Sequence, residues 1–124
     1  VPIGSRQPLG VSAGGMALLS ALPPDDMATV ITAIEPRLAA YGNLDAEKLR
    51  DLCASTKRLG YASTGNHAVP GVRAMGLPIF DRSSTPIAAI TVAATQSRMD
   101  ARRMATLLPV LKTAALEMTR LLQQ

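Results

Sequence analysis

The sequence has few aromatic residues and almost no cysteine or histidine. Among 124 residues there are two Tyr, one Phe and no Trp, with one Cys and one His. A core must therefore be built from Ala, Leu, Ile, Val and Met, and its small side chains allow close approach of elements or a cavity between them. A single cysteine excludes an internal disulfide, and the reducing cytoplasm is the simplest location.

Several motifs that would carry chemistry or membrane insertion are absent. No apolar run approaches the ~20 residues that span a bilayer, and Val1–Leu9 lacks the features of a signal peptide. The glycine-rich phosphate motifs GxGxxG and GxxxxGK[ST] do not occur. One His and one Cys do not make a metal site. We therefore expect no metal, no cofactor and no enzyme; a hydrolase using His67 is an alternative that no spacing supports.

Composition indicates one globular domain with a basic surface. Hydrophobic residues make up 48% of the chain, and the net charge is +4. The densest basic group is Arg98, Arg102 and Arg103. No aromatic residues are interleaved with it, as binding of single-stranded nucleic acid would need. We interpret the group as a solvated helix face.

Capping residues and apolar spacing predict four helices and a short strand. The expected helices are Ala13–Leu22 after Ser12, a second from Pro24 to Pro36, Ala46–Leu59 between Asp45 and Gly60, and Ala101–Leu122 after Asp100 with a kink or restart at Pro109. Arg37–Asn43 is predicted as a loop and Gly60–Ser63 as a strand. The third helix is expected to bury Leu49, Leu52, Cys53, Thr56 and Leu59, with Cys53 as a packed core thiol. The last should present one apolar stripe from Met104 to Leu122.

A β-hairpin is predicted between residues 72 and 94, with strands Val72–Phe80 and Ile87–Ala94 around a turn at Asp81–Pro86. Alternation gives the hairpin two different faces. The bulky face carries Met75, Leu77, Ile79, Ile90 and Val92, and the small face carries Ala74, Gly76, Ala89, Thr91 and Ala93. Pro78 inside the first strand indicates an edge position or a bulge.

The small face has two interpretations. It can receive a closely packed helix, such as the glycine-containing helix that begins at Ser12, or it can leave room for a ligand. The free N–H groups at the start of that helix, beside Gly14 and Gly15, would suit a carboxylate. From the residues alone, close packing of the helix is favoured, and the ligand interpretation stays open.

An ordered set of motifs spans nearly the whole chain. The set is Gly4-x-Arg6-x-Pro8-Leu9, the small-residue helix ending Leu22-Pro23, Arg58-x-Gly60-Tyr61-Ala62, Pro70-Gly71-Val72-Arg73, Pro78-x-Phe80-Asp81, the Ala-rich strand and a final helix containing Pro109. In this order it resembles the effector-binding C-terminal domain of IclR-type bacterial transcriptional regulators. The resemblance implies an α/β (α+β) fold with a GAF-like antiparallel sheet flanked by helices and a long C-terminal helix.

The resemblance also implies a sensor with several partners. Residues 1–124 would form a single effector-binding domain, truncated at its N-terminal side and without the winged helix-turn-helix that binds DNA in the family. The chain would bind a small-molecule effector, assemble as a homodimer or homotetramer, and reach DNA only through the missing N-terminal domain. No membrane partner is implied. The alternative is a dimerisation module without a ligand.

Family members that bind small oxoacids suggest which positions would hold the effector. Backbone amides match Ala13 and Gly14, and the family's side-chain ligands match Thr64, Ala74, Thr91 and Ala93. Met16, Asn66 and His67 complete the expected ligand-binding set. Because three of the four side-chain positions have lost the family's polar group, we expect an organic acid less polar than glyoxylate or pyruvate.

Overall fold

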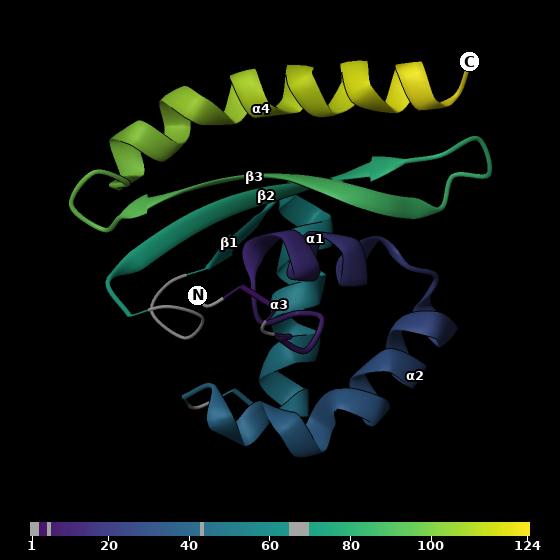
Figure 1. The fold of residues 1–124 in the computed structure, drawn as a ribbon, viewed down its shortest axis with the longest axis vertical. Helices are drawn as coiled ribbons and strands as arrows, with labels where there is room; N and C mark the ends of the chain where they lie inside the picture. The colour runs from purple at the N-terminus through teal and green to yellow at the C-terminus, as the bar shows by residue number, and fades with distance from the viewer. Residues whose placement is uncertain (1–2, 5, 43, 65–69) are drawn as a thin grey trace.

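The computed structural model describes residues 3–4, 6–42, 44–64 and 70–124 as one antiparallel sheet between two layers of helices (Figure 1). The strand order is β1-β2-β3. Helix α4 covers one face of the sheet, and α1, α2 and α3 lie on the other side. The elements are α1 (Ala13–Ala21), α2 (Pro24–Ile34), the 3₁₀ helix η1 (Glu35–Ala40), α3 (Ala46–Leu59), β1 (Ala62–Thr64), β2 (Val72–Phe80), β3 (Pro86–Thr95) and α4 (Ala101–Leu122). The predicted α+β class is confirmed.

Each of the three predicted N-caps holds the first turn of its helix. The side chain of Ser12 accepts a hydrogen bond from the Gly15 amide at 3.0 Å. Asp45 accepts one from Lys48 N at 2.8 Å, and Asp100 accepts one from Arg103 N at 2.8 Å. Each cap satisfies a donor that the helix itself leaves free.

Two predicted boundaries between α2 and β1 are wrong. Arg37 was expected to open a loop, but the described residues continue through η1 to Ala40. Pro36 stands in the first turn of η1, where its missing N–H costs no hydrogen bond, so it ends α2 and starts a tighter turn. Gly60 takes the left-handed φ of 83° that closes α3. For that reason β1 begins at Ala62 rather than Gly60.

The register of β2 and β3 confirms the two predicted faces. Met75 pairs with Val92 and Leu77 with Ile90, whereas Gly76 pairs with Thr91. Directly opposed residues lie on the same face of a sheet, so bulky and small side chains segregate to opposite faces.

The bulky face packs on α4 and forms one of two hydrophobic clusters. Its buried members are Met75, Leu77, Met99, Leu111 and Ala115. The predicted stripe on α4 is only partly correct, since Met118 and Leu122 are exposed in the last turns. The helix is continuous through Pro109, so no restart occurs, and Figure 1 shows its first turns slanting toward the sheet before the straight remainder.

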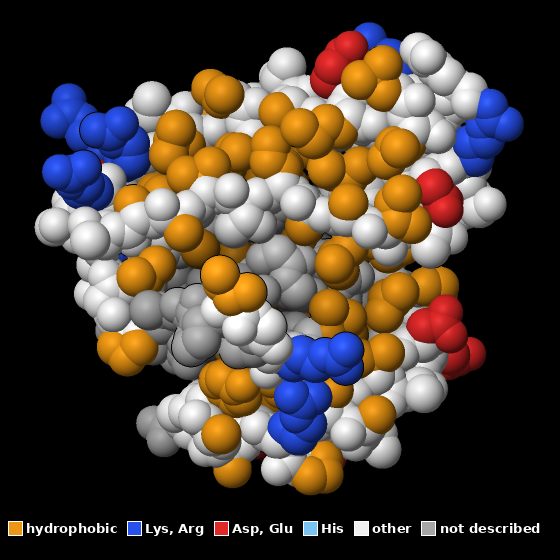
Figure 2. All heavy atoms as spheres, viewed as in Figure 1, with side chains coloured by type: hydrophobic (Ala, Val, Ile, Leu, Met, Phe, Trp, Pro, Cys, Tyr) orange, Lys and Arg blue, Asp and Glu red, His pale blue; other side chains and the backbone are white. Residues whose placement is uncertain are grey.

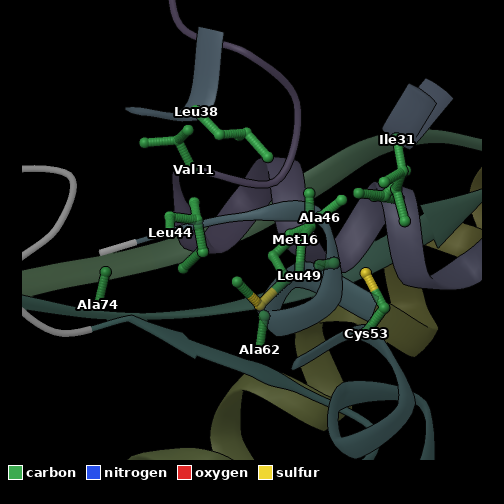
Figure 3. Close-up of a cluster of buried hydrophobic side chains, with 13 residues drawn as sticks. Val11, Met16, Ile31, Leu38, Leu44, Ala46, Leu49, Cys53, Ala62 and Ala74 are labelled. Carbon is green, nitrogen blue, oxygen red and sulfur yellow. The ribbon is translucent and has the colours of Figure 1, made fainter. Parts of the chain in front are cut away.

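The second cluster fills the space between α1, α2, η1, α3 and the small face (Figure 3). Leu49, Cys53 and Thr56 of α3 are buried, as predicted. Leu59 was expected with them but is half exposed. At 3.6 residues per turn, Leu59 lies about 80° around the helix axis from Leu49, at the margin of the buried stripe.

Beyond Gly76 no described strand pairs with β2 on its β1 side, because β1 begins at Ala62 opposite Gly76. Pro78 lies in this uncovered stretch, which agrees with the predicted edge position, and the register shifts between Ile79 and Phe80. The Phe80 amide donates to the Thr119 hydroxyl of α4 at 3.2 Å. A missing donor at Pro78 and a satisfied donor at Phe80 protect this edge from further strands.

Candidate ligand site

The first turn of α1 lies directly on the small face of the sheet. A Cβ placed on Gly76 would come within 2.7 Å of the carbonyl carbon and oxygen of Ala13, and within 3.0 Å of the Gly14 nitrogen. Real Cβ atoms do not approach backbone this closely, so only glycine fits here. At Gly76 the small face therefore receives a helix, which is the interpretation that the residues alone favoured.

The same turn carries two backbone donors that no described residue accepts from. The Gly15 amide donates to Ser12 Oγ and the Met16 amide to Ser12 O, at 3.0 and 2.8 Å. For the amides of Ala13 and Gly14 the described part of the chain provides no acceptor. A carboxylate placed at these amides would also meet the partial positive charge of the helix N-terminus.

The Thr91 hydroxyl lies beside these amides. A Cβ on Gly14 would come within 2.9 Å of Thr91 Oγ1 and 3.6 Å of the Ala89 Cβ. Glycine at position 14 therefore allows the backbone of α1 to approach the Thr91 side chain closely. Thr91 as a whole residue is exposed, and its hydroxyl lies close to Gly14 of α1.

A second row of predicted site residues crosses all three strands. Thr64 pairs with Ala74, and Ala74 pairs with Ala93. Thr64 and Ala74 are 3% and 8% exposed, whereas Ala93 on β3 is exposed. No residue that the structure describes forms a hydrogen bond with the Thr64 hydroxyl. A buried hydroxyl without a partner costs roughly 1–3 kcal/mol, which a ligand or water beside it would recover.

The remaining predicted site residues are less informative. Met16 is 1% exposed and belongs to the core, and in Figure 3 its side chain ends beside Ala62. Asn66 and His67 lie outside the described residues. The structure thus brings Ala13, Gly14 and Thr91 together, and places Thr64, Ala74 and Ala93 one row away on the same face.

Other candidate groups do not add chemistry to this site. Burial raises the pKa of Cys53 to about 11, so its thiol stays protonated and unreactive at neutral pH, as expected of a core thiol. Within residues 3–4, 6–42, 44–64 and 70–124 no three His, Cys, Asp or Glu side chains are grouped to hold a metal ion. Arg98, Arg102 and Arg103 are exposed, and Lys and Arg side chains gather where α4 begins (Figure 2).

No described helix has the length and apolar character needed to cross a membrane.

Comparison with known proteins decides the family. The family described as bacterial transcriptional regulator IclR C-terminal matches residues 1–120. The chain belongs to this family. The IclR C-terminal fold agrees with the antiparallel sheet and flanking helices described above, and it confirms the resemblance that the ordered motifs indicate.

Relatives of this IclR C-terminal domain are transcriptional regulators rather than enzymes, as the sequence predicts. A probable HTH-type regulator, ArcR of Halobacterium salinarum, is 31% identical over 83% of this chain and 40% of its own length. The crystal structure of the repressor BlcR of Agobacterium tumefaciens is 25% identical, with a TM-score of 0.86, covering 100% of this chain and 51% of that one. The chain spans less than half the length of the curated relatives that it matches.

One solved structure with the same fold contains a bound small molecule. The inducer-binding domain of the Acinetobacter transcription factor PobR, as a double mutant in complex with 3-hydroxybenzoic acid, has a TM-score of 0.78. It is 23% identical, covering 94% of this chain and 67% of that one, which shows a shared fold.

The sequence predicts that a helix can pack on the small face but does not predict which residue of β2 it meets. Gly76 interrupts an otherwise apolar strand, and such a glycine often marks the close approach of another backbone. The tertiary fold determines which backbone approaches Gly76, and here it is that of Ala13 and Gly14.

Proposed function

We propose that this chain is the effector-sensing domain of a DNA-binding transcriptional regulator and that its effector is an organic acid. The observation that supports the proposal is the pair of amides at Ala13 and Gly14, for which the described residues provide no acceptor, close to the Thr91 hydroxyl. Two aligned N–H groups and a hydroxyl are suitable donors for a carboxylate. The buried hydroxyl of Thr64, in the next row of the sheet, would accept or donate one further hydrogen bond.

The polarity of the site favours an acid with an apolar body. Ala74 and Ala93 carry no polar side-chain atom, so they would contact hydrocarbon rather than a second polar group. A small, strongly hydrated acid such as glyoxylate or pyruvate would lose more hydrogen bonds to water than this site could replace. The PobR fold accommodates 3-hydroxybenzoic acid, which makes that compound a suitable probe here.

The effector would act through assembly and a DNA-binding domain. Relatives described as HTH-type regulators are about twice as long as this chain, and we propose that DNA contact is made by a separate N-terminal domain. We further propose a homodimer or homotetramer. An effector that binds one arrangement of subunits better than another shifts the equilibrium between them by its difference in affinity.

A thermal-shift titration of the chain with 3-hydroxybenzoate, benzoate, pyruvate and glyoxylate tests the proposal. The aromatic acids should raise the melting temperature in a saturable way, more strongly than the two oxoacids. Gly14→Val inserts a branched side chain between α1 and Thr91, and Thr91→Val removes the hydroxyl; both should weaken the response. Thr95→Val, on the same strand and face, is the matched control and should not.

An acid that binds the wild-type chain and both site variants equally well would contradict this location. If no acid binds, the alternative function is favoured, namely an interaction module in which the small face serves only helix packing. The close contact between Gly76 and Ala13 supports that alternative, because it shows that part of the small face is already filled.

A further inference from the structure

Two hollows meet beyond the C-terminal end of α1, at the end of β2 that no described strand pairs with on its β1 side. One has a volume of about 350 Å³ and is lined by the last turns of α1 and α3 together with β2. The other, of about 320 Å³, lies between β2 and α4. Both are lined by Gly60, Pro78 and Phe80, so they adjoin where β1 leaves β2 uncovered. We name the two hollows together the β2-edge groove.

Apart from two lysine side chains, the walls of the β2-edge groove are apolar or carry hydroxyl groups that already form hydrogen bonds. Ser20 Oγ donates to Ala17 O at 3.0 Å, and Thr56 Oγ1 donates to Leu52 O at 2.7 Å. These two buried hydroxyls therefore need no ligand. The other residues that line the hollow beside α1 are Ala21, Lys57, Gly60, Pro78 and Phe80. Each hollow has a volume at the lower end of the range that small-molecule sites occupy.

The charge at the groove is of one sign. Lys57 lines the hollow beside α1, and Lys112 lines the hollow beside α4. No Asp or Glu lines either hollow, and the only ion pair found among the described residues joins Arg120 to Glu117. An ammonium group above an apolar wall, with no carboxylate near it, complements a ligand that has an anionic head and an apolar body.

We propose that the β2-edge groove is a second binding site, for an amphiphilic carboxylate. The apolar chain of the ligand lies against Pro78 and Phe80, and its carboxylate pairs with Lys57. Lys57 is chosen over Lys112 because its hollow is bounded by three elements, α1, α3 and β2, and is the larger of the two. This site is independent of the proposed effector site, which lies at the N-terminal end of α1.

Titration of the ¹⁵N-labelled chain with octanoate, followed by amide chemical shifts, tests the proposal. Saturable shifts are expected at Ala21, Gly60 and Phe80. Octylammonium has the same chain and the opposite charge, and its affinity should be about three- to fivefold lower, the effect of a solvent-exposed ion pair.

Two variants separate the contributions of charge and shape. Lys57→Gln should reduce octanoate affinity about three- to fivefold and remove the preference over octylammonium. Arg37→Gln, an exposed cation of η1 away from the groove, is the matched control and should change neither. Ala21→Leu fills the hollow beside α1 and should abolish the shifts at Phe80.

The outcomes also distinguish this site from the proposed effector site. Octanoate shifts confined to Ala13, Gly14 and Thr91 would overturn the β2-edge site while leaving the proposed function intact. Absence of saturable shifts at Ala21, Gly60 and Phe80 would also overturn it, as would octanoate binding that Lys57→Gln leaves unchanged. If Ala21→Leu disturbs the fold, Lys57→Gln decides alone, because its side chain is exposed.

Discussion

Gly76→Ala should destabilise the chain although alanine is normally the better residue in a strand. The added Cβ would stand 2.7 Å from the carbonyl carbon and oxygen of Ala13 and 3.0 Å from the Gly14 nitrogen. These are backbone atoms at the start of α1, so no side chain can rotate away. To admit the methyl group, α1 has to move off the sheet, which also displaces the amides of Ala13 and Gly14.

The expected magnitude follows from two opposing effects. Overpacking a filled site costs about 1–3 kcal/mol, whereas replacing glycine by alanine in a strand returns about 0.5–1 kcal/mol of backbone entropy. The net loss in the free energy of unfolding should be roughly 1–2 kcal/mol. Urea unfolding followed by far-ultraviolet circular dichroism measures this loss. If the free energy of unfolding depends on urea concentration with the same slope as in the wild type, the folded and unfolded states have kept their compactness.

Gly14→Ala is the matched comparison. Its Cβ would meet Thr91 Oγ1 at 2.9 Å, but this atom ends a short, exposed side chain that can change rotamer. The rotamer cost of about 0.5–1.5 kcal/mol is offset by the higher helix propensity of alanine, up to ~1 kcal/mol, so the net change should be small. If Gly76→Ala is as stable as the wild type, the backbone of α1 does not lie on the sheet at this point.

Three further predictions concern the rest of the fold. Burial raises the pKa of Cys53 from 9.0 to about 11, so between these pH values the folded chain keeps a proton that the unfolded chain releases. The free energy of unfolding, measured with urea, should therefore fall as pH rises from 9 toward 11. Cys53→Ala should remove that part of the pH dependence. Met75→Ala should lower the free energy of unfolding by about 2–5 kcal/mol in urea, whereas Met118→Ala on the exposed side of α4 should lower it by less than about 1 kcal/mol. Equal losses would contradict the assigned packing. Thr119→Val should lower stability by about 0.5–1.5 kcal/mol and speed hydrogen exchange at the Phe80 amide, and unchanged exchange would show that this bond does not protect the β2 edge.

Local signals in the sequence were sufficient to place most elements. Ser12, Asp45 and Asp100 each cap the predicted helix, because a side-chain oxygen at that position meets a free amide three residues later. Alternation in Val72–Phe80 separated the two faces correctly, because a strand has a fixed period of two. Both kinds of signal act over a few residues and need no knowledge of the rest of the fold.

The errors occur where burial depends on neighbouring elements. Leu59 is apolar and helically spaced, yet it lies at the margin of the stripe that α3 buries. Met118 continues the stripe of α4 past the region that the sheet covers. Periodicity gives the direction of a side chain around its own helix but not how far the opposing layer extends.

The candidate site was predicted more by resemblance than by residue patterns. Thr64, Ala74 and Ala93 share one row and one face of the sheet, as the resemblance to oxoacid-binding family members requires. Nothing in the sequence shows that Ala93 is exposed while Thr64 is buried. Ala74 lies on the central strand β2 and Thr64 on β1, which packs against both α1 and α3, whereas Ala93 lies on the edge strand β3. The ligand role of all these residues stays a prediction.

The amide proton shifts of Ala13 and Gly14 test the central proposal most directly. In a titration of the ¹⁵N-labelled chain with 3-hydroxybenzoate, both protons should move downfield in a saturable way, because each gains a charged acceptor. The uncharged analogue 3-hydroxybenzamide should produce a smaller effect. If an aromatic acid binds and these two amides do not respond, the effector is not held at the N-terminus of α1 and the proposed site is wrong.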